Sequence, residues 1–313
     1  MLQARAGLLT KIRAYFAQAG VLEVTTPTCS RHANTDPALE NFQVTYTGPG
    51  APVGQPFYLH TSPEFHMKRL LAAGSGSIYQ TCQVFRDGEC GRQHNPEFSL
   101  LEWYRLGFDH HRLMADVAAL VNGVLPEPRL VERHSYGDIF QHHLGVNPHD
   151  STASALQACA VEQGIVGADR LDLPSRDAWL DLLLIHCIEP QLGRQKLSFI
   201  YDYPASQSSL ARVRQDDTPV AERFELYMNG MELANGFHEL TDSAEQRRRF
   251  EQDLIQREAA GQKPVPMDEN LLAALAAGLP DCAGVALGID RLLMQITGAK
   301  RIDDVLAFPL GRA

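Results

Sequence analysis

Two arginines in this chain stand where rigid structural elements are expected to begin or end. Arg86 closes a strand-like run over residues 78–86. Arg291 follows a glycine-punctuated run, residues 284–290, that is expected to turn from strand into helix. Because the chain has no P-loop motif, two guanidinium groups on rigid elements suggest a site that holds a polyphosphate through bidentate hydrogen bonds. The alternative is that each is a surface or ion-paired arginine, as most arginines are.

A carboxylate lies in the middle of the strand-like run at residues 97–105. Side chains alternate along a strand, so Glu102 shares a face with Phe98, Leu100 and Tyr104. A glutamate among aromatic side chains is costly unless it is paired. The run therefore suggests a pocket floor, in which an aromatic ring stacks on a base and the acid holds a cation. An exposed stretch or a structural ion pair is the alternative.

A second pair of carboxylates is placed by a hairpin. Asn229-Gly230 is the strongest short signal for a type I′ turn. The pairs expected around it are Met228 with Met231, Tyr227 with Glu232, and Leu226 with Leu233. Glu225 and Glu232 would then lie on one face, roughly 7–8 Å apart. A Mg²⁺ ion that bridges phosphates would suit such a pair, and a lysine or arginine that neutralises it is the alternative.

Glu64 and Glu239 are further acids on or beside expected strands. Together with Glu102 they would suit a substrate with two amines, although each alone is more commonly a surface acid. The adjacent histidine pairs at 110–111 and 142–143 lack metal-ligand spacing and are expected to be solvated.

The elements that must position these residues indicate a mixed α+β domain, with an antiparallel sheet flanked by helices. The other expected strands cover residues 21–27, 59–61 and 222–234, with a loop or hairpin tip at 45–58. Helices are expected at 2–19, 64–71, 110–124, 242–260 and 267–277, and one begins near Arg291. Residues 127–205 are the least regular part, with helical stretches at 152–163 and 176–188. They are interpreted as a helical insertion.

Composition narrows the class of protein. The net charge of −10 over 313 residues disfavours an extended nucleic-acid surface. Six cysteines without a C-x-x-C pair suggest reduced thiols and a cytoplasmic location. The longest apolar run, residues 271–279, is too short to span a bilayer.

Taken together, the motifs resemble those of class II aminoacyl-tRNA synthetases. Motif 2 is matched by Phe85-Arg86, residues 94–98 (His-Asn-Pro-Glu-Phe) and residues 102–104 (Glu-Trp-Tyr). The first helix and the strand that ends at Pro27 resemble motif 1, and residues 284–291 resemble motif 3. Residues 232–240 are similar to the lysyl-tRNA synthetase signature, and the resemblance covers nearly the whole chain.

The resemblance implies roles for individual residues. Arg86 would hold the α-phosphate of ATP, Arg291 the γ-phosphate, and Phe98 would stack on the adenine. Glu225 and Glu232 would bind Mg²⁺, which with ATP makes up the expected cofactors. The remaining expected ATP contacts are Asp87, Gly88, His94, Asn95, Glu232, Leu233 and Gly288. The expected contacts of a lysine-like substrate are Ser62, Pro63, Glu64, Glu102, Tyr104, Asn235, Glu239 and Ala286.

Three departures from the family pattern refine this expectation. The chain begins at the motif 1 helix, so a single catalytic domain over residues 1–313 without the anticodon-reading OB-fold is expected. Ala286 stands where motif 3 normally has glycine, and its methyl would shrink the pocket near the substrate α-carbon. Gly88 stands where motif 2 has an acid, and Glu89 is the neighbouring acid that would replace it.

The first two departures match the truncated lysyl-type branch that modifies elongation factor P. The resemblance thus implies an ATP-dependent ligase that activates (R)-β-lysine, or lysine, as an adenylate and transfers it to a lysine ε-amine of elongation factor P. A homodimer with no membrane contact is expected. The alternatives are an enzyme that charges tRNA, which is disfavoured, and a non-catalytic regulatory subunit. The presence of Arg86, Arg291, Glu225 and Glu232 speaks against the last.

Overall fold

The computed structural model describes residues 1–52 and 54–313. Its internal contacts divide the chain into two compact units. The first unit comprises Met1–Phe108, Gly123–Pro126 and Glu239–Ala313, and the second comprises Asp109–Asn122 and Glu127–His238. The expected insertion, residues 127–205, falls within the second unit. A single domain over residues 1–313 stays a prediction.

Four strands of the first unit pair side by side. They are β1 (Leu22–Glu23), β5 (Ile78–Phe85), β6 (Glu97–Leu106) and β12 (Cys282–Gly288). β1 is parallel to β5, whereas β5, β6 and β12 pair antiparallel. The two strands expected around Arg86 are therefore confirmed. The strand expected at 21–27 is too long, because the last amide bonded to β5 is that of Val24, which donates to Tyr79 O at 2.8 Å.

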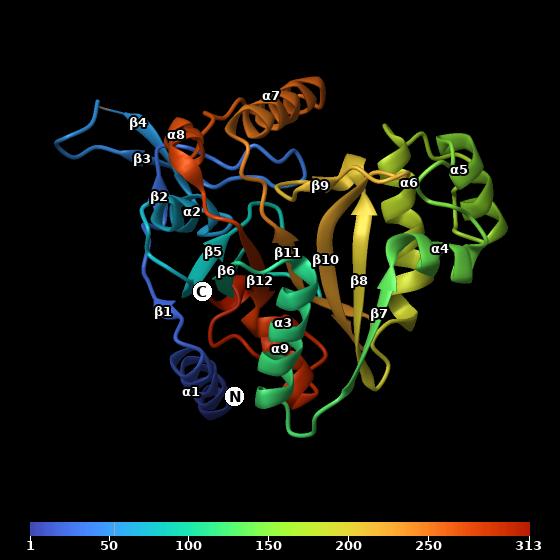
Figure 1. Cartoon of the computed structure of the whole chain (residues 1–313), viewed down its shortest axis with the longest axis horizontal. Helices are drawn as coiled ribbons and strands as arrows, with labels where there is room; N and C mark the ends of the chain where they lie inside the picture. The colour runs from blue at the N-terminus through green and yellow to red at the C-terminus, as the bar shows by residue number, and fades with distance from the viewer. Residues whose placement is uncertain (53) are drawn as a thin grey trace. The chain divides into compact units, whose positions relative to one another are not determined.

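A small antiparallel sheet also belongs to the first unit (Figure 1). It contains β2 (Cys29–Ser30), β4 (Gln55–Leu59) and β3 (Gln43–Tyr46), in that order. The loop or hairpin tip expected at 45–58 is confirmed as the tip of the β3–β4 hairpin. Its two ends belong to the strands, and residue 53 lies outside the described residues. The strand expected at 59–61 ends at Leu59. All four residues of β3 are exposed, so no pattern of burial marks that strand in the sequence.

The helices of the first unit follow the expected pattern closely. They are α1 (Leu2–Gln18), α2 (Glu64–Ala72), α7 (Ser243–Ala259), α8 (Glu269–Gly278) and α9 (Ile289–Thr297). α1 buries Leu8, Ile12 and Phe16, and the Phe16 ring stacks on Tyr79 of β5 with centroids 4.2 Å apart. α9 begins directly after β12. Arg291 therefore lies in the first turn of a helix whose start is fixed by a strand.

The second unit is built on β7 (Leu130–Ser135), β8 (Lys196–Pro204), β10 (Val220–Met228) and β11 (Met231–His238). β7 is parallel to β8, the other neighbours pair antiparallel, and β9 (Val213–Arg214) pairs with β10. α3 (His110–Val124) begins in this unit. α4 (Tyr136–Leu144) and α6 (Arg176–Leu183) lie beside β7 and β8, and α5 (Ala153–Glu162) lies outside them and packs on α6 (Figure 1). The helices expected at 110–124 and 152–163 are confirmed. The helical stretch expected at 176–188 is confirmed as α6 followed directly by a π-helix over Leu184–Ile188, whereas β7 and β8 are additional to the expected elements.

The β10–β11 hairpin turns at Asn229 and Gly230, whose φ angles of 53° and 71° are those of a type I′ turn. Tyr227 pairs with Glu232, and Met228 with Met231, as expected. A bulge next to Tyr227 then shifts the register, so Leu226 pairs with Ala234. The expected pairing of Leu226 with Leu233 is wrong.

The α+β class with an antiparallel sheet flanked by helices is confirmed. Within the described part of the chain, no helix is long and apolar enough to cross a membrane.

Candidate active site

Three carboxylates of the first unit gather around one buried lysine. Lys68 lies on α2, one helical turn after Glu64, and its Nζ contacts Glu64 Oε1 at 2.7 Å and Glu239 Oε2 at 2.6 Å. Its side chain is 1% exposed. Burial lowers the pKa of Lys68, but the charges of Glu239 and Glu64 outweigh that effect and raise it above its usual value. Lys68 is therefore a fixed cation between two acids.

Glu102 is the third member of this carboxylate cluster (Glu64, Glu102 and Glu239 around Lys68). Its Oε1 accepts a hydrogen bond from Tyr104 OH at 2.7 Å. Its Oε2 is buried and has no hydrogen-bond partner among the described residues. Burial, followed by the charge of Glu64, raises the pKa of Glu102 well above its usual value. An oxygen in this state is an acceptor that lacks a donor.

β12 shapes the face on which Glu102 and Tyr104 lie. Gly284 pairs with Tyr104 and Ala286 pairs with Glu102, and directly paired residues of antiparallel strands point to the same face. A Cβ on Gly284 would come within 2.3 Å of the Tyr104 ring and 2.5 Å of Glu239 Oε1. Only glycine therefore fits at 284, whereas the Ala286 methyl stands beside the carboxylate.

Ser62 and Pro63 lead into α2. The Ser62 hydroxyl accepts a hydrogen bond from the Glu64 amide at 3.4 Å, and Pro63 occupies the N-cap position of the helix. Both residues therefore fix where Glu64 starts the helix, and with it the register that brings Lys68 to the cluster.

Arg86 lies at the end of β5 and packs on Phe98. Its guanidinium carbon is 5.1 Å from the centroid of the Phe98 ring. Nη1 is 3.5 Å from Glu89 Oε1, so the acid after Gly88 does reach this arginine. Nε is buried and has no hydrogen-bond partner in the described part of the chain. Gly88 has φ +81°, a conformation that L side chains rarely adopt.

Arg291 lies on α9 and contacts the same connection between β5 and β6. Its Nη2 is 2.7 Å from His94 Nε2, and its Nε donates to Gln93 O at 3.4 Å. Asp290 fixes this start of α9, because its Oδ2 accepts from the Ser99 amide at 2.7 Å and its Oδ1 pairs with Arg5. Both arginines therefore lie at one loop, residues 86–96. Arg86 is its first residue, and Arg291 contacts it from α9.

Other residues expected at the nucleotide have different surroundings. Asn95 is buried. Its side-chain Nδ2 donates to Glu97 O at 2.6 Å, and its Oδ1 accepts from the backbone amide of Leu310 at 3.0 Å. Asp87 is exposed, and its amide donates to Glu40 O at 3.0 Å. A Cβ on Gly288 would meet only the Arg291 side chain, at 3.7 Å. Asn95 therefore holds the loop, whereas a side chain at position 288 would be in ordinary contact with Arg291.

The expected metal ligands belong to the second unit. Glu225 accepts from Arg223 Nη2 through Oε1 and from Tyr227 OH, 2.5 Å away, through Oε2. Arg223 Nε also donates to Asn235 Oδ1 at 3.2 Å. Glu232 pairs with Tyr227, and Asn235 with Glu225, in the strand register, so the two acids and the amide share one face. The Leu233 side chain is buried in the core.

Arg223 is therefore the positive neighbour of Glu225 that the sequence alternative anticipated, although its identity was not predicted. Carboxylate oxygens remain the donors that Mg²⁺ prefers, and Arg223 and Tyr227 hold Glu225 in place as hydrogen-bonded neighbours of a metal ligand do. By donor type, Glu225 and Glu232 fit that ion.

Comparisons with known proteins bear on these motifs. A family model described as "tRNA synthetases class II (D, K and N)" matches residues 1–312. A relative from Yersinia enterocolitica named elongation factor P–(R)-β-lysine ligase is 51% identical over 310 residues, which cover 99% of this chain and 94% of the relative. A relative of the same name from Vibrio atlanticus is 50% identical over 313 residues, covering 100% of this chain and 96% of the relative. One from Edwardsiella ictaluri is 51% identical over 310 residues, with the same coverage as the first.

Proposed function

Because this chain belongs to the family of class II tRNA synthetases of the D, K and N type, we propose that it is an ATP-dependent ligase acting on elongation factor P. It activates (R)-β-lysine as an adenylate and transfers the β-lysyl group to the ε-amine of a lysine on that factor. The relatives that match over nearly their whole length carry the name of this activity.

The carboxylate cluster is the observation that carries the proposal. Three carboxylates against the single ammonium of Lys68 leave two negative charges when all three acids are ionised, and a diamine supplies two positive ones. Glu102 Oε2 is the buried acceptor without a partner among the described residues. An ammonium group of the substrate would satisfy it and, through its charge, favour the ionised carboxylate.

Arg86 and Arg291 are proposed to bind the triphosphate. Both lie at the 86–96 loop. Arg86 Nε, which has no hydrogen-bond partner among the described residues, offers a donor to a phosphate oxygen. The Arg86 guanidinium would move off the Phe98 ring, and that ring would then stack on the adenine. The further ATP contacts proposed are Asp87, Gly88, His94, Asn95, Glu232, Leu233 and Gly288.

The chemistry needs no nucleophile from the protein. The substrate carboxylate oxygen attacks the α-phosphorus, the bond to the β-phosphate oxygen breaks, and pyrophosphate leaves. The deprotonated lysine amine of elongation factor P then attacks the acyl carbon, the amide forms, and AMP leaves. The arginines lower the barrier by neutralising charge and by positioning the reactants. Mg²⁺ held by Glu225 and Glu232 would supply further charge neutralisation on the phosphates.

The choice of β-lysine over α-lysine rests on Ala286. Its methyl shares a strand face with Glu102 and takes up space that a glycine would leave to an amine on the α-carbon. Ser62, Pro63, Glu64, Tyr104, Asn235 and Glu239 are proposed as the other substrate contacts. We also propose a homodimer built through the motif 1 region, and a cytoplasmic location.

The rival functions are tRNA charging and a non-catalytic regulatory role. ATP–pyrophosphate exchange with (R)-β-lysine, α-lysine and ornithine separates the last from both enzymes, because only an adenylate-forming protein exchanges label. Parallel charging of total tRNA separates the remaining two. The proposal expects exchange that is fastest with (R)-β-lysine and no aminoacyl-tRNA. Absence of exchange with every amine would overturn it in favour of the regulatory role.

A further inference from the structure

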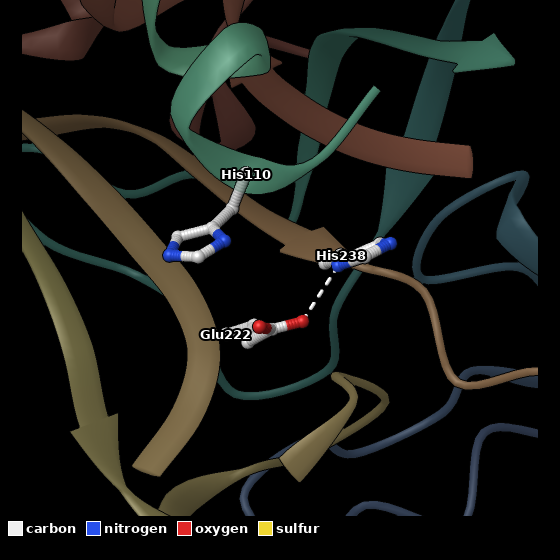
Figure 2. A group of neighbouring side chains, drawn as sticks. All are labelled: His110, Glu222 and His238. Atoms are coloured by element: carbon white, nitrogen blue, oxygen red, sulfur yellow. Dashed lines mark hydrogen bonds and ion pairs between the residues drawn. The ribbon is translucent and has the colours of Figure 1, made fainter. Parts of the chain in front are cut away.

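Two histidines and a glutamate of the second unit converge in a place that the proposed ligase chemistry does not use (Figure 2). His110 begins α3, Glu222 lies on β10, and His238 ends β11. Each offers a ligand atom, and these atoms all lie within 4.8 Å of one another. The expectation that His110 is solvated is wrong, because the residue is only 2% exposed.

The His110 ring is held from one side and left unsatisfied on the other. Its Nε2 is 3.1 Å from Asp202 Oδ1. Its Nδ1 is buried and has no hydrogen-bond partner among the described residues, and Figure 2 shows one ring nitrogen turned toward His238 and Glu222. A buried polar atom without a partner costs free energy. His110 Nδ1 is therefore available to bind a metal ion.

Glu222 and His238 complete the arrangement. His238 Nδ1 and Glu222 Oε2 are 2.6 Å apart, which is the length of a hydrogen bond. Two ligands of a tetrahedral zinc ion lie about 3.3 Å apart, so this pair has to open slightly to admit an ion. The other oxygen of Glu222 is 3.5 Å from Arg214, which also pairs with Asp202 at 2.7 Å. Arg214 therefore meets three carboxylates, those of Glu222, Asp202 and Asp216, while the charge of Arg212 also acts on Glu222.

We propose that His110, Glu222 and His238 form a binding site for a zinc-type divalent metal ion. Two imidazoles and one carboxylate are a donor set that Zn²⁺ accepts, with a fourth position for water. Asp202 plays the part of the outer carboxylate that fixes the ring of a metal-bound histidine. The ion takes the place of the proton between His238 and Glu222, so binding releases a proton.

Each ligand comes from a different element. A bound ion would therefore connect the start of α3, the first part of β10 and the last residue of β11. Its chemistry differs from that of the proposed Mg²⁺ ligands Glu225 and Glu232, which offer oxygen atoms alone. The inference is independent of the proposed function, because it needs neither ATP nor lysine.

Zinc binding to the chelator-treated full-length protein, in competition with a chromophoric chelator, tests this site. One zinc per chain is expected. His110→Gln should weaken binding by about 100-fold or more, and Asp202→Asn by about 10–100-fold. The matched control is His142→Gln, an exposed histidine on α4, which should bind zinc as the parent does. Equal affinities of the parent and His110→Gln would overturn the proposal.

Cobalt substitution decides the question without any variant. Co²⁺ at a site of two histidines and a carboxylate gives weak visible bands, whereas Co²⁺ on any of the six cysteines adds an intense near-ultraviolet thiolate band. The proposal expects the first spectrum at one equivalent. A thiolate band, or no spectrum at all, would overturn it even if His110→Gln did not fold.

Discussion

Ala286 pairs directly with Glu102 across β12 and β6. The methyl group and the buried carboxylate therefore point to the same face of the sheet, with typical Cβ separations of about 5 Å. A substitution at residue 286 can therefore act directly on the carboxylate that is proposed to bind the substrate amine. It also makes the choice between lysine isomers accessible to a single substitution.

The Ala286→Gly variant should use α-lysine better than the parent. Removal of the methyl opens space beside Glu102, and a misfit of this size is worth about 1–3 kcal/mol, or roughly 10–200-fold in specificity. Pyrophosphate exchange with both isomers measures the ratio of kcat/KM values. Ala283→Gly is the control, because Ala283 is buried on the opposite face of the same strand. An isomer ratio that Ala286→Gly leaves unchanged would refute this pocket model.

Replacement of Lys68 by methionine should destabilise the first unit. The ammonium lies between Glu64 and Glu239, and removal of one partner from a buried ionic group costs about 3–5 kcal/mol. Urea denaturation measures the free energy of unfolding. Lys263→Met, at an exposed position, should unfold like the parent. A loss no larger than that of the control would show that Lys68 is not the cation holding the cluster together.

Binding of the diamine should release a proton from Glu102. Burial raises the pKa of this carboxyl group well above the usual 4.5, so it keeps its proton at pH values where a free glutamate has lost it. An ammonium favours the ionised form, so affinity should rise with pH until the raised pKa is passed and fall in acid. Calorimetry in buffers of different ionisation enthalpy counts the protons, and Glu102→Gln should remove the part due to this group. Equal proton release by the parent and Glu102→Gln would show that the released proton comes from another group.

Lysine should not replace either of the two arginines that are proposed to bind ATP. A lysine offers a point charge instead of a planar fork, and loss of a charge-stabilising donor commonly costs about 10²–10³-fold in rate. Arg86→Lys and Arg291→Lys should each lower kcat/KM for ATP in pyrophosphate exchange by about 100-fold. Arg301→Lys is the control, since Arg301 forms an exposed pair with Asp303. Near-normal pyrophosphate exchange by both variants would show that neither arginine contributes to adenylate formation.

The two motif 3 glycines should respond differently to alanine. A Cβ at Gly284 would overlap Tyr104 and Glu239, whereas one at Gly288 would make only ordinary contact with Arg291. Gly284→Ala should therefore lower the melting temperature and abolish lysine use. Gly288→Ala should fold normally and raise KM for ATP if the nucleotide approaches its backbone. A normal KM for ATP in a folded Gly288→Ala protein would exclude that approach.

Much of the fold could be predicted because local signals agreed with tertiary pairing. The class II motifs, whose family is confirmed by the match over residues 1–312, bring Glu64, Glu102 and Glu239 of the first unit together. The Asn229-Gly230 turn was confirmed, but the bulge next to Tyr227 was not foreseen. No glycine or proline marks it, and buried residues on both faces of β10 conceal the change of register.

Other features depend on contacts that no local pattern reveals. Lys68 follows Glu64 by four residues, which resembles an exposed helical ion pair, and only Glu239 from far along the chain makes it a buried centre. β7 and β8 pair parallel across a long connection, so neither has a hairpin signal. His110 was interpreted as solvated because its partners Asp202, Glu222 and His238 are all distant in sequence.

The proposed reaction joins a β-amino acid diamine to a lysine of elongation factor P. The most direct test is intact-mass and peptide mass spectrometry of purified elongation factor P after incubation with this protein, ATP and each lysine isomer. We expect one added β-lysyl group on a single lysine ε-amine, in a reaction that depends on ATP and is fastest with (R)-β-lysine. An unmodified factor, in a reaction where the protein forms the adenylate and charges tRNA instead, would contradict it.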